Sequence, residues 1–155
     1  MPEHRENHPL ASVPGVLALA AWSLYVLCAA LYFLPDLPPT ELFNGSFGIA
    51  ACLAAACNFR YWRATALTAS SLYLVLYAIR VFRMTALTAD VPFPSALSLY
   101  YAMSWQVGVG VFQEKGTVAG LAYAFLQYAM PVLMVALIAA ILISRRSRPG
   151  PSQAG

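Results

Sequence analysis

The sequence predicts an all-α integral membrane protein: a four-helix transmembrane bundle with an extracytoplasmic interfacial or re-entrant segment between the third and fourth spans. Hydrophobic residues make up 61% of the 155-residue chain and charged residues only 10%. So few charges cannot cover a water-soluble domain, in which about 25% of residues are charged. The apolar residues also form runs close to the roughly 20 residues that a helix needs to cross a bilayer. These runs lack the alternation typical of a strand.

The chain is expected to begin with a disordered cytoplasmic tail at residues 1–12, followed by a first span at 13–34. The tail is polar, carries charges of both signs and contains two prolines. The following apolar run is longer than the core of a signal peptide, which has about 7–15 residues, so we expect it to remain as a helix. Pro35, Pro38 and Pro39 then end this helix, because proline interrupts the backbone hydrogen-bond ladder.

Small residues dominate the second predicted span, at 42–59. Gly48, Cys52 and Ala56 recur at four-residue spacing, a pattern that lets helix backbones approach closely within a membrane. Such a helix offers little bulk to lipid. We therefore expect it to lie centrally in the bundle, with these three residues at a helix–helix contact.

Polar side chains recur along one face of the third predicted span, at 64–82. They are spaced three and four residues apart, which places them above one another on a helix. A functional interpretation makes this face the wall of a polar cavity that binds an anionic headgroup or substrate. The candidate ligand-binding residues are Ser70, Tyr73, Tyr77, Arg80 and Arg83.

A purely structural interpretation of Arg80 stays open beside the functional one. Arg80 lies about one turn from the end of its span, so its side chain can extend toward the membrane surface. There it could pair with Asp36, Glu41 or Asp90. In that case the arginine needs no ligand to explain it.

Residues 95–112 are moderately apolar, and we predict that they do not cross the bilayer. The segment contains serines, a glutamine and two glycines, and its aromatic residues lie in its middle, whereas aromatic anchors of a span belong at its ends. It is expected to rest at the outer surface or to enter the membrane and return. The last span, at 117–143, contains Pro131, which frees the carbonyl of Gln127 and predicts a kink. The Gln127 side chain is expected to form hydrogen bonds across helices.

The distribution of Lys and Arg predicts that both termini are cytoplasmic. With four spans, six of the nine basic residues fall on the cytoplasmic side, the side that they favour. A fifth crossing at 95–112 would change the division to four inside and five outside. We therefore expect a multi-pass protein of the cell (plasma) membrane. Its transmembrane helical domain would cover 13–143, followed by a basic, disordered cytoplasmic tail at 144–155.

The sequence excludes several kinds of chemistry. No Asp, Glu, His or Lys falls within the four predicted spans. This argues against proton-coupled transport, which needs an ionisable group at depth, and more weakly against an enzyme. The three cysteines lack the C-x-x-C spacing of redox and metal sites, so no catalytic residue, metal or cofactor is predicted. The basic residues are too few, and too close to the bilayer, to indicate nucleic acid.

The leading functional expectation is a small non-catalytic protein that acts by helix–helix association with a membrane partner or with another copy of itself. The small-residue second helix and the lack of ionisable groups at depth motivate it. The alternative is a binder or carrier of a lipophilic or anionic small molecule or lipid, using the face of the third span. A membrane-embedded enzyme is the third class. No motif in the sequence names a reaction, a ligand or a partner.

Overall fold

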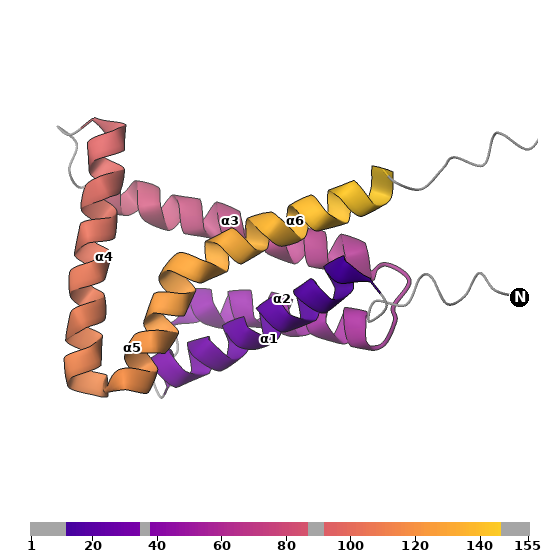
Figure 1. Ribbon diagram of the computed structural model, residues 1–155, viewed down its shortest axis with the longest axis horizontal. Coiled ribbons are helices and arrows are strands. Elements are labelled where there is room, and N and C mark those ends of the chain that lie inside the picture. Colours follow the sequence, from indigo (N-terminus) through magenta and orange to yellow (C-terminus); the bar gives the residue numbers. More distant parts are fainter. Residues whose placement is uncertain (1–11, 35–37, 87–91, 147–155) are drawn as a thin grey trace, which may run out of the picture.

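A computed structural model describes residues 12–34, 38–86 and 92–146, and these residues are helical nearly throughout, without a strand (Figure 1). Most of the two predicted tails lies outside the described residues. The helices are α1 (Val13–Phe33), α2 (Pro39–Ala56), α3 (Trp62–Ala86), α4 (Phe93–Lys115), α5 (Thr117–Ala124), the π-helix η2 (Phe125–Ala129) and α6 (Met130–Arg146).

Three of the helical segments are long and apolar enough to cross a membrane. They are Val13–Phe33, Trp62–Met84 and the continuous segment Thr117–Ser144. This result agrees with the prediction of a helical membrane protein. The remaining predicted span, the second at 42–59, corresponds to α2, which is not among the three and has polar residues in its first turns.

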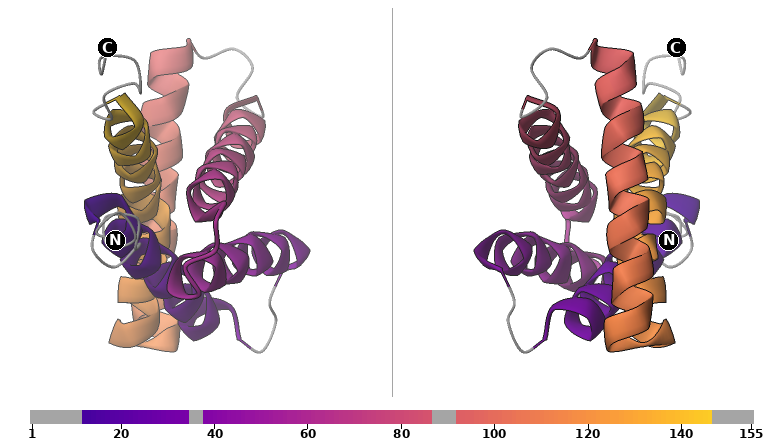
Figure 2. Two further views of the ribbon diagram at one scale, coloured as in Figure 1. Left: turned by 90° about the vertical axis from the view of Figure 1, so that its right-hand side faces the viewer. Right: turned by 90° about the vertical axis from the view of Figure 1, so that its left-hand side faces the viewer.

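Three helices of the bundle share one axis. In Figure 1, α1, α3 and α6 extend along the long axis of the molecule, and α4 stands across one end of them. Figure 2 looks along that axis: α1, α3 and α6 are foreshortened, α4 is seen at full length, and α2 lies obliquely across the view. The start of α1 and the end of α6 lie together at the end opposite α4. The described part of the chain therefore enters and leaves the bundle at the same end.

Large side chains of α1, α3 and α6 fill the core, and α2 contributes small ones. Trp22, the largest fully buried side chain, lies over Gly48: a Cβ added at Gly48 would stand 2.5 Å from Cε3 of the indole. Cys52 is half-buried, with its sulfur 3.7 Å from Oγ of Ser23. Ala56 is exposed. The other small residues of α2 that are fully buried are Ala51 and Ala55.

The last span is bent where the sequence predicts a kink. The π-helix η2 ends two residues before Pro131, and Figure 1 shows the helix changing direction there. Pro131 has no N–H to donate to the carbonyl of Gln127, and a tyrosine hydroxyl takes its place. Tyr77 donates to this carbonyl at 3.1 Å, and Tyr73 donates to the carbonyl of Leu126 at 3.2 Å. The side-chain donors of α3 thus satisfy backbone groups that the π-helix and the proline free.

The segment predicted at 95–112 is one uninterrupted helix, α4, which extends from Phe93 to Lys115. It contains no reversal of the chain, which a re-entrant segment would require. Tyr100, Ser104 and Val111 are buried on the side that faces the bundle. Around the opposite side lie exposed Gln106 and Gln113. One helix thus presents an anchoring face to the bundle, while its other sides expose both polar side chains and apolar ones such as Trp105 and Val109.

Candidate ligand-binding site

A cavity of about 440 Å³ lies at the end of the bundle that α4 crosses. We call it the end cavity. Its walls come from the last turns of α1 and α3, the first turns of α2, and the α5–η2 segment. Most of the lining side chains are aromatic or aliphatic, and they include Tyr32, Phe33, Leu76, Ile79 and Leu126.

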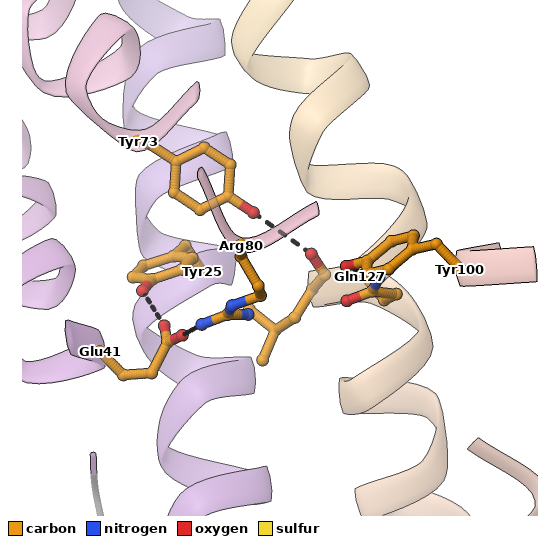
Figure 3. Close-up of polar contacts among 7 residues, drawn as sticks. Tyr25, Glu41, Tyr73, Arg80, Tyr100 and Gln127 are labelled. Atoms are coloured by element: carbon orange, nitrogen blue, oxygen red, sulfur yellow. Dashed lines mark hydrogen bonds and ion pairs between the residues drawn. The ribbon is translucent and has the colours of Figure 1, made fainter. Parts of the chain in front are cut away.

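A charge pair forms the most polar part of the end cavity. The carboxylate of Glu41 accepts a hydrogen bond from the Tyr25 hydroxyl at 2.5 Å and another from the guanidinium of Arg80, with which it forms a salt bridge. Figure 3 shows the three side chains pointing toward one another from three different helices. The side chain of Glu41 is 5% exposed and that of Arg80 46%. The buried carboxylate is therefore the fixed member of the pair.

The position of Glu41 corrects the sequence analysis, which placed this residue in a loop before a span starting at residue 42. The helix α2 instead begins at Pro39, so Glu41 lies in its first turn. A carboxylate is favourable at a helix N-terminus and a cation near a C-terminus, because each opposes the local end of the helix dipole. Glu41 occupies the first of these positions on α2, and Arg83, in the last turn of α3, occupies the second. Proline at the first helical position followed by an acidic residue is a helix-start signal, so the sequence did contain an indication of this site.

The structure brings together four of the five residues predicted on the face of α3. Tyr73, Tyr77, Arg80 and Arg83 all line the end cavity. Ser70 does not; it is fully buried in the core, and its hydroxyl has no hydrogen-bond partner within the described part of the chain. The proposed pairing of Arg80 with Glu41 is present, whereas Asp36 and Asp90 lie outside the described residues.

The prediction that Gln127 forms hydrogen bonds across helices is confirmed. Its side-chain nitrogen donates to the hydroxyl of Tyr100 at 2.5 Å and to that of Ser104 at 3.2 Å, both on α4. The hydroxyl of Tyr123 also donates to the carbonyl of Ser104 at 3.1 Å. Figure 3 shows Gln127 and Tyr100 beside the charge pair. One wall of the end cavity thus also fixes α4 across the end of the bundle.

The described residues that line the end cavity carry one carboxylate, Glu41, and two guanidiniums, Arg80 and Arg83. In the same part of the chain, no three His, Cys, Asp or Glu side chains come together as a metal site would require. The remaining polar groups are tyrosine hydroxyls, a threonine and two amides. Such a site can hold a molecule by charge, hydrogen bonds and aromatic contact.

Neither a protein-family model, nor a curated protein, nor a solved structure matches this chain.

Proposed function

We propose that this chain is a membrane protein that binds an amphipathic small molecule in the end cavity. The observation that carries the proposal is a salt bridge between the buried carboxylate of Glu41 and the half-exposed guanidinium of Arg80, in the wall of an otherwise largely apolar cavity of about 440 Å³. This volume falls within the range of about 300–1,000 Å³ that is common for ligand sites. Ionisable residues within membrane helices are costly, and by default they indicate a functional site.

The composition of the walls fits a ligand that is polar at one end only. Glu41, Arg80 and Arg83 supply charge on the side formed by α2 and α3. Leu76 and Leu126 supply aliphatic surface in the same cavity. A headgroup would therefore lie against the charged residues, with its apolar part against the aliphatic and aromatic ones.

Binding is favoured over association with a membrane partner or a second copy of the chain. The association hypothesis came from the small residues of α2. Gly48 and Ala55 are buried within this chain, and Gly48 contacts Trp22 of α1. The small residues therefore have an internal role. What remains to support association is the exposed apolar side of the helices, which lipid also covers.

For the membrane topology we propose four crossings, with α2 as the second, both termini in the cytoplasm of a cell-membrane protein, and α4 on the outer surface. In support, α2 connects α1 to α3 and packs against both, and the chain enters and leaves the bundle at one end. The outward side of α4 carries Gln106 and Gln113, and Trp105 on its flank is 67% exposed. Aromatic side chains at that depth suit the headgroup region.

Single cysteines at Ser95 and Gln113 are expected to react with an impermeant thiol reagent that is added from outside. Both positions are exposed and belong to the two ends of α4. The experiment uses intact cells and a variant without the three native cysteines. A variant that keeps Cys57, which is exposed in the turn between α2 and α3, should react only after permeabilisation. Reaction at Ser95 without reaction at Gln113 would show that α4 crosses the membrane.

The binding proposal is tested with a series of twelve-carbon amphiphiles that differ only in the headgroup: phosphate, carboxylate, trimethylammonium and hydroxyl. The full-length protein in lipid nanodiscs should gain thermal stability with at least one of them. The gain should depend on probe concentration, because a ligand that binds only the folded state stabilises it by mass action. A protein whose melting temperature none of the four probes changes would not be an amphiphile binder.

A further inference from the structure

We propose that the headgroup of the ligand is an anion, a phosphate or a carboxylate, bound by Arg80 and Arg83, and that Glu41 is a built-in counter-ion that positions Arg80 and lowers the affinity for that anion. This inference rests on the proposed function and assigns the chemistry of the same site. It gives Glu41 a role opposite to that of a ligand-binding residue.

The geometry leaves part of Arg80 available for a ligand. Its hydrogen bond to Glu41 is made through Nη2, whereas a guanidinium has five N–H donors in a rigid fork. The side chain lines the end cavity and is nearly half exposed. An anion with two oxygens can therefore bind another edge of the same fork, as guanidiniums commonly do with phosphate and carboxylate. The pair with Glu41 does not need to break.

Glu41 is held in place independently of any ligand. It is buried, and the Tyr25 hydroxyl on α1 donates to one carboxylate oxygen while Arg80 donates to the other. This arrangement fixes the guanidinium at the wall of the cavity before a ligand arrives. It also neutralises the arginine when the cavity is empty, which matters because an unpaired charge within a membrane is costly.

The charge of the site decides the class of headgroup. Among the described lining residues, the one carboxylate and two guanidiniums leave one positive charge in excess. An anionic headgroup neutralises this excess, whereas a cationic one increases it. Arg83 is exposed and lines the same cavity, so it supplies the second positive group without a structural role in the pair.

Removing the charge of Glu41 while keeping its shape should strengthen anion binding. In Glu41→Gln, the side-chain carbonyl can still accept a hydrogen bond, but the like charge near the ligand is gone. At an intermediate dielectric, one like charge within a few ångström corresponds to roughly a 10- to 100-fold change in affinity. Arg80→Gln should reverse the effect and weaken binding to a similar extent.

The test measures the dissociation constants of dodecyl phosphate, dodecanoate, inorganic phosphate and dodecyltrimethylammonium for the full-length protein in nanodiscs. We expect one of the two anionic amphiphiles to bind most tightly, Glu41→Gln to bind it at least about tenfold more tightly, and Arg83→Gln to bind it more weakly. Arg83 is exposed, so its variant folds even if a variant of the buried pair does not, and unchanged affinity in it would count against the proposal.

The outcomes distinguish failure of the anion assignment from failure of the proposed amphiphile binding. Tightest binding of dodecyltrimethylammonium, or weaker anion binding by a folded Glu41→Gln protein, would overturn the assignment of Glu41 and the anion but leave an amphiphile binder. Inorganic phosphate binding as tightly as dodecyl phosphate would support the anion and overturn the amphipathic ligand. Absence of binding by every probe would overturn both.

Discussion

Replacing Arg80 with methionine is expected to destabilise the protein by about 3–5 kcal/mol, because the change leaves a buried carboxylate without its charge partner. Glu41 is almost inaccessible, and after the substitution Tyr25 would be the one described side chain that still donates to it. The free energy of unfolding in mixed detergent micelles measures the effect. Methionine keeps the apolar stem of the arginine, so lost packing contributes little.

Removing the charge of Glu41 instead of that of Arg80 should lower the free energy of unfolding clearly less. In Glu41→Gln, Arg80 keeps a hydrogen-bond acceptor and is nearly half exposed, so its charge can reach polar surroundings at the membrane surface. The double variant Arg80→Met, Glu41→Met should regain much of the stability that Arg80→Met loses, because no buried charge remains to be compensated. If Arg80→Met unfolds like the wild-type protein, the two side chains do not form a buried pair.

Gly48→Leu is expected to destabilise the protein by about 1–3 kcal/mol, the usual cost of forcing extra volume into a packed contact. The first added atom alone would overlap the indole of Trp22, which is fully buried. The melting temperature and the free energy of unfolding in detergent measure the loss.

Gly45→Leu is the matched control for this substitution. It changes the same residue type on the same helix, and a Cβ at Gly45 meets nothing within 4 Å. Both variants gain about 1 kcal/mol of helix propensity, so their difference isolates packing against Trp22. Ala56→Leu should also be tolerated, because Ala56 is exposed. Equal stability of Gly48→Leu and Gly45→Leu would mean that α2 does not pack on α1 as described.

Long apolar runs, and the prolines that interrupt them, predict where the helices lie, but they do not predict which side of a helix is buried. The four-residue spacing of Gly48, Cys52 and Ala56 drifts around a helix that has 3.6 residues per turn. The face that α2 buries follows the true period and continues through Ala51 and Ala55. The small residues of α2 thus offer two possible contact faces, one through Cys52 and Ala56 and one through Ala51 and Ala55. The positions of the neighbouring helices decide which face is buried, and the sequence of α2 does not contain that information.

Only the part of the site that lies on a single helix could be predicted from the sequence. The three- and four-residue spacing placed Tyr73, Tyr77 and Arg80 on one face of α3, because the spacing of residues within one helix determines which of them share a face. Glu41 was predicted only as one of three possible partners of Arg80 and was placed outside the helices, since the prolines before it were interpreted as the end of a helix and not also as the start of the next. Its contact with Arg80 joins residues 39 positions apart, and helix packing alone decides such a contact.

The most direct test of the central claim is the dissociation constant of dodecyl phosphate for a protein whose end cavity has been filled. Leu76 lines the cavity, whereas its neighbour Val75 is 54% exposed on the surface of α3. Leu76→Trp should weaken binding at least about tenfold, the equivalent of 1.4 kcal/mol, without changing any charge. Val75→Trp should bind like the wild-type protein. Wild-type affinity in a folded Leu76→Trp protein would show that the ligand does not occupy the end cavity.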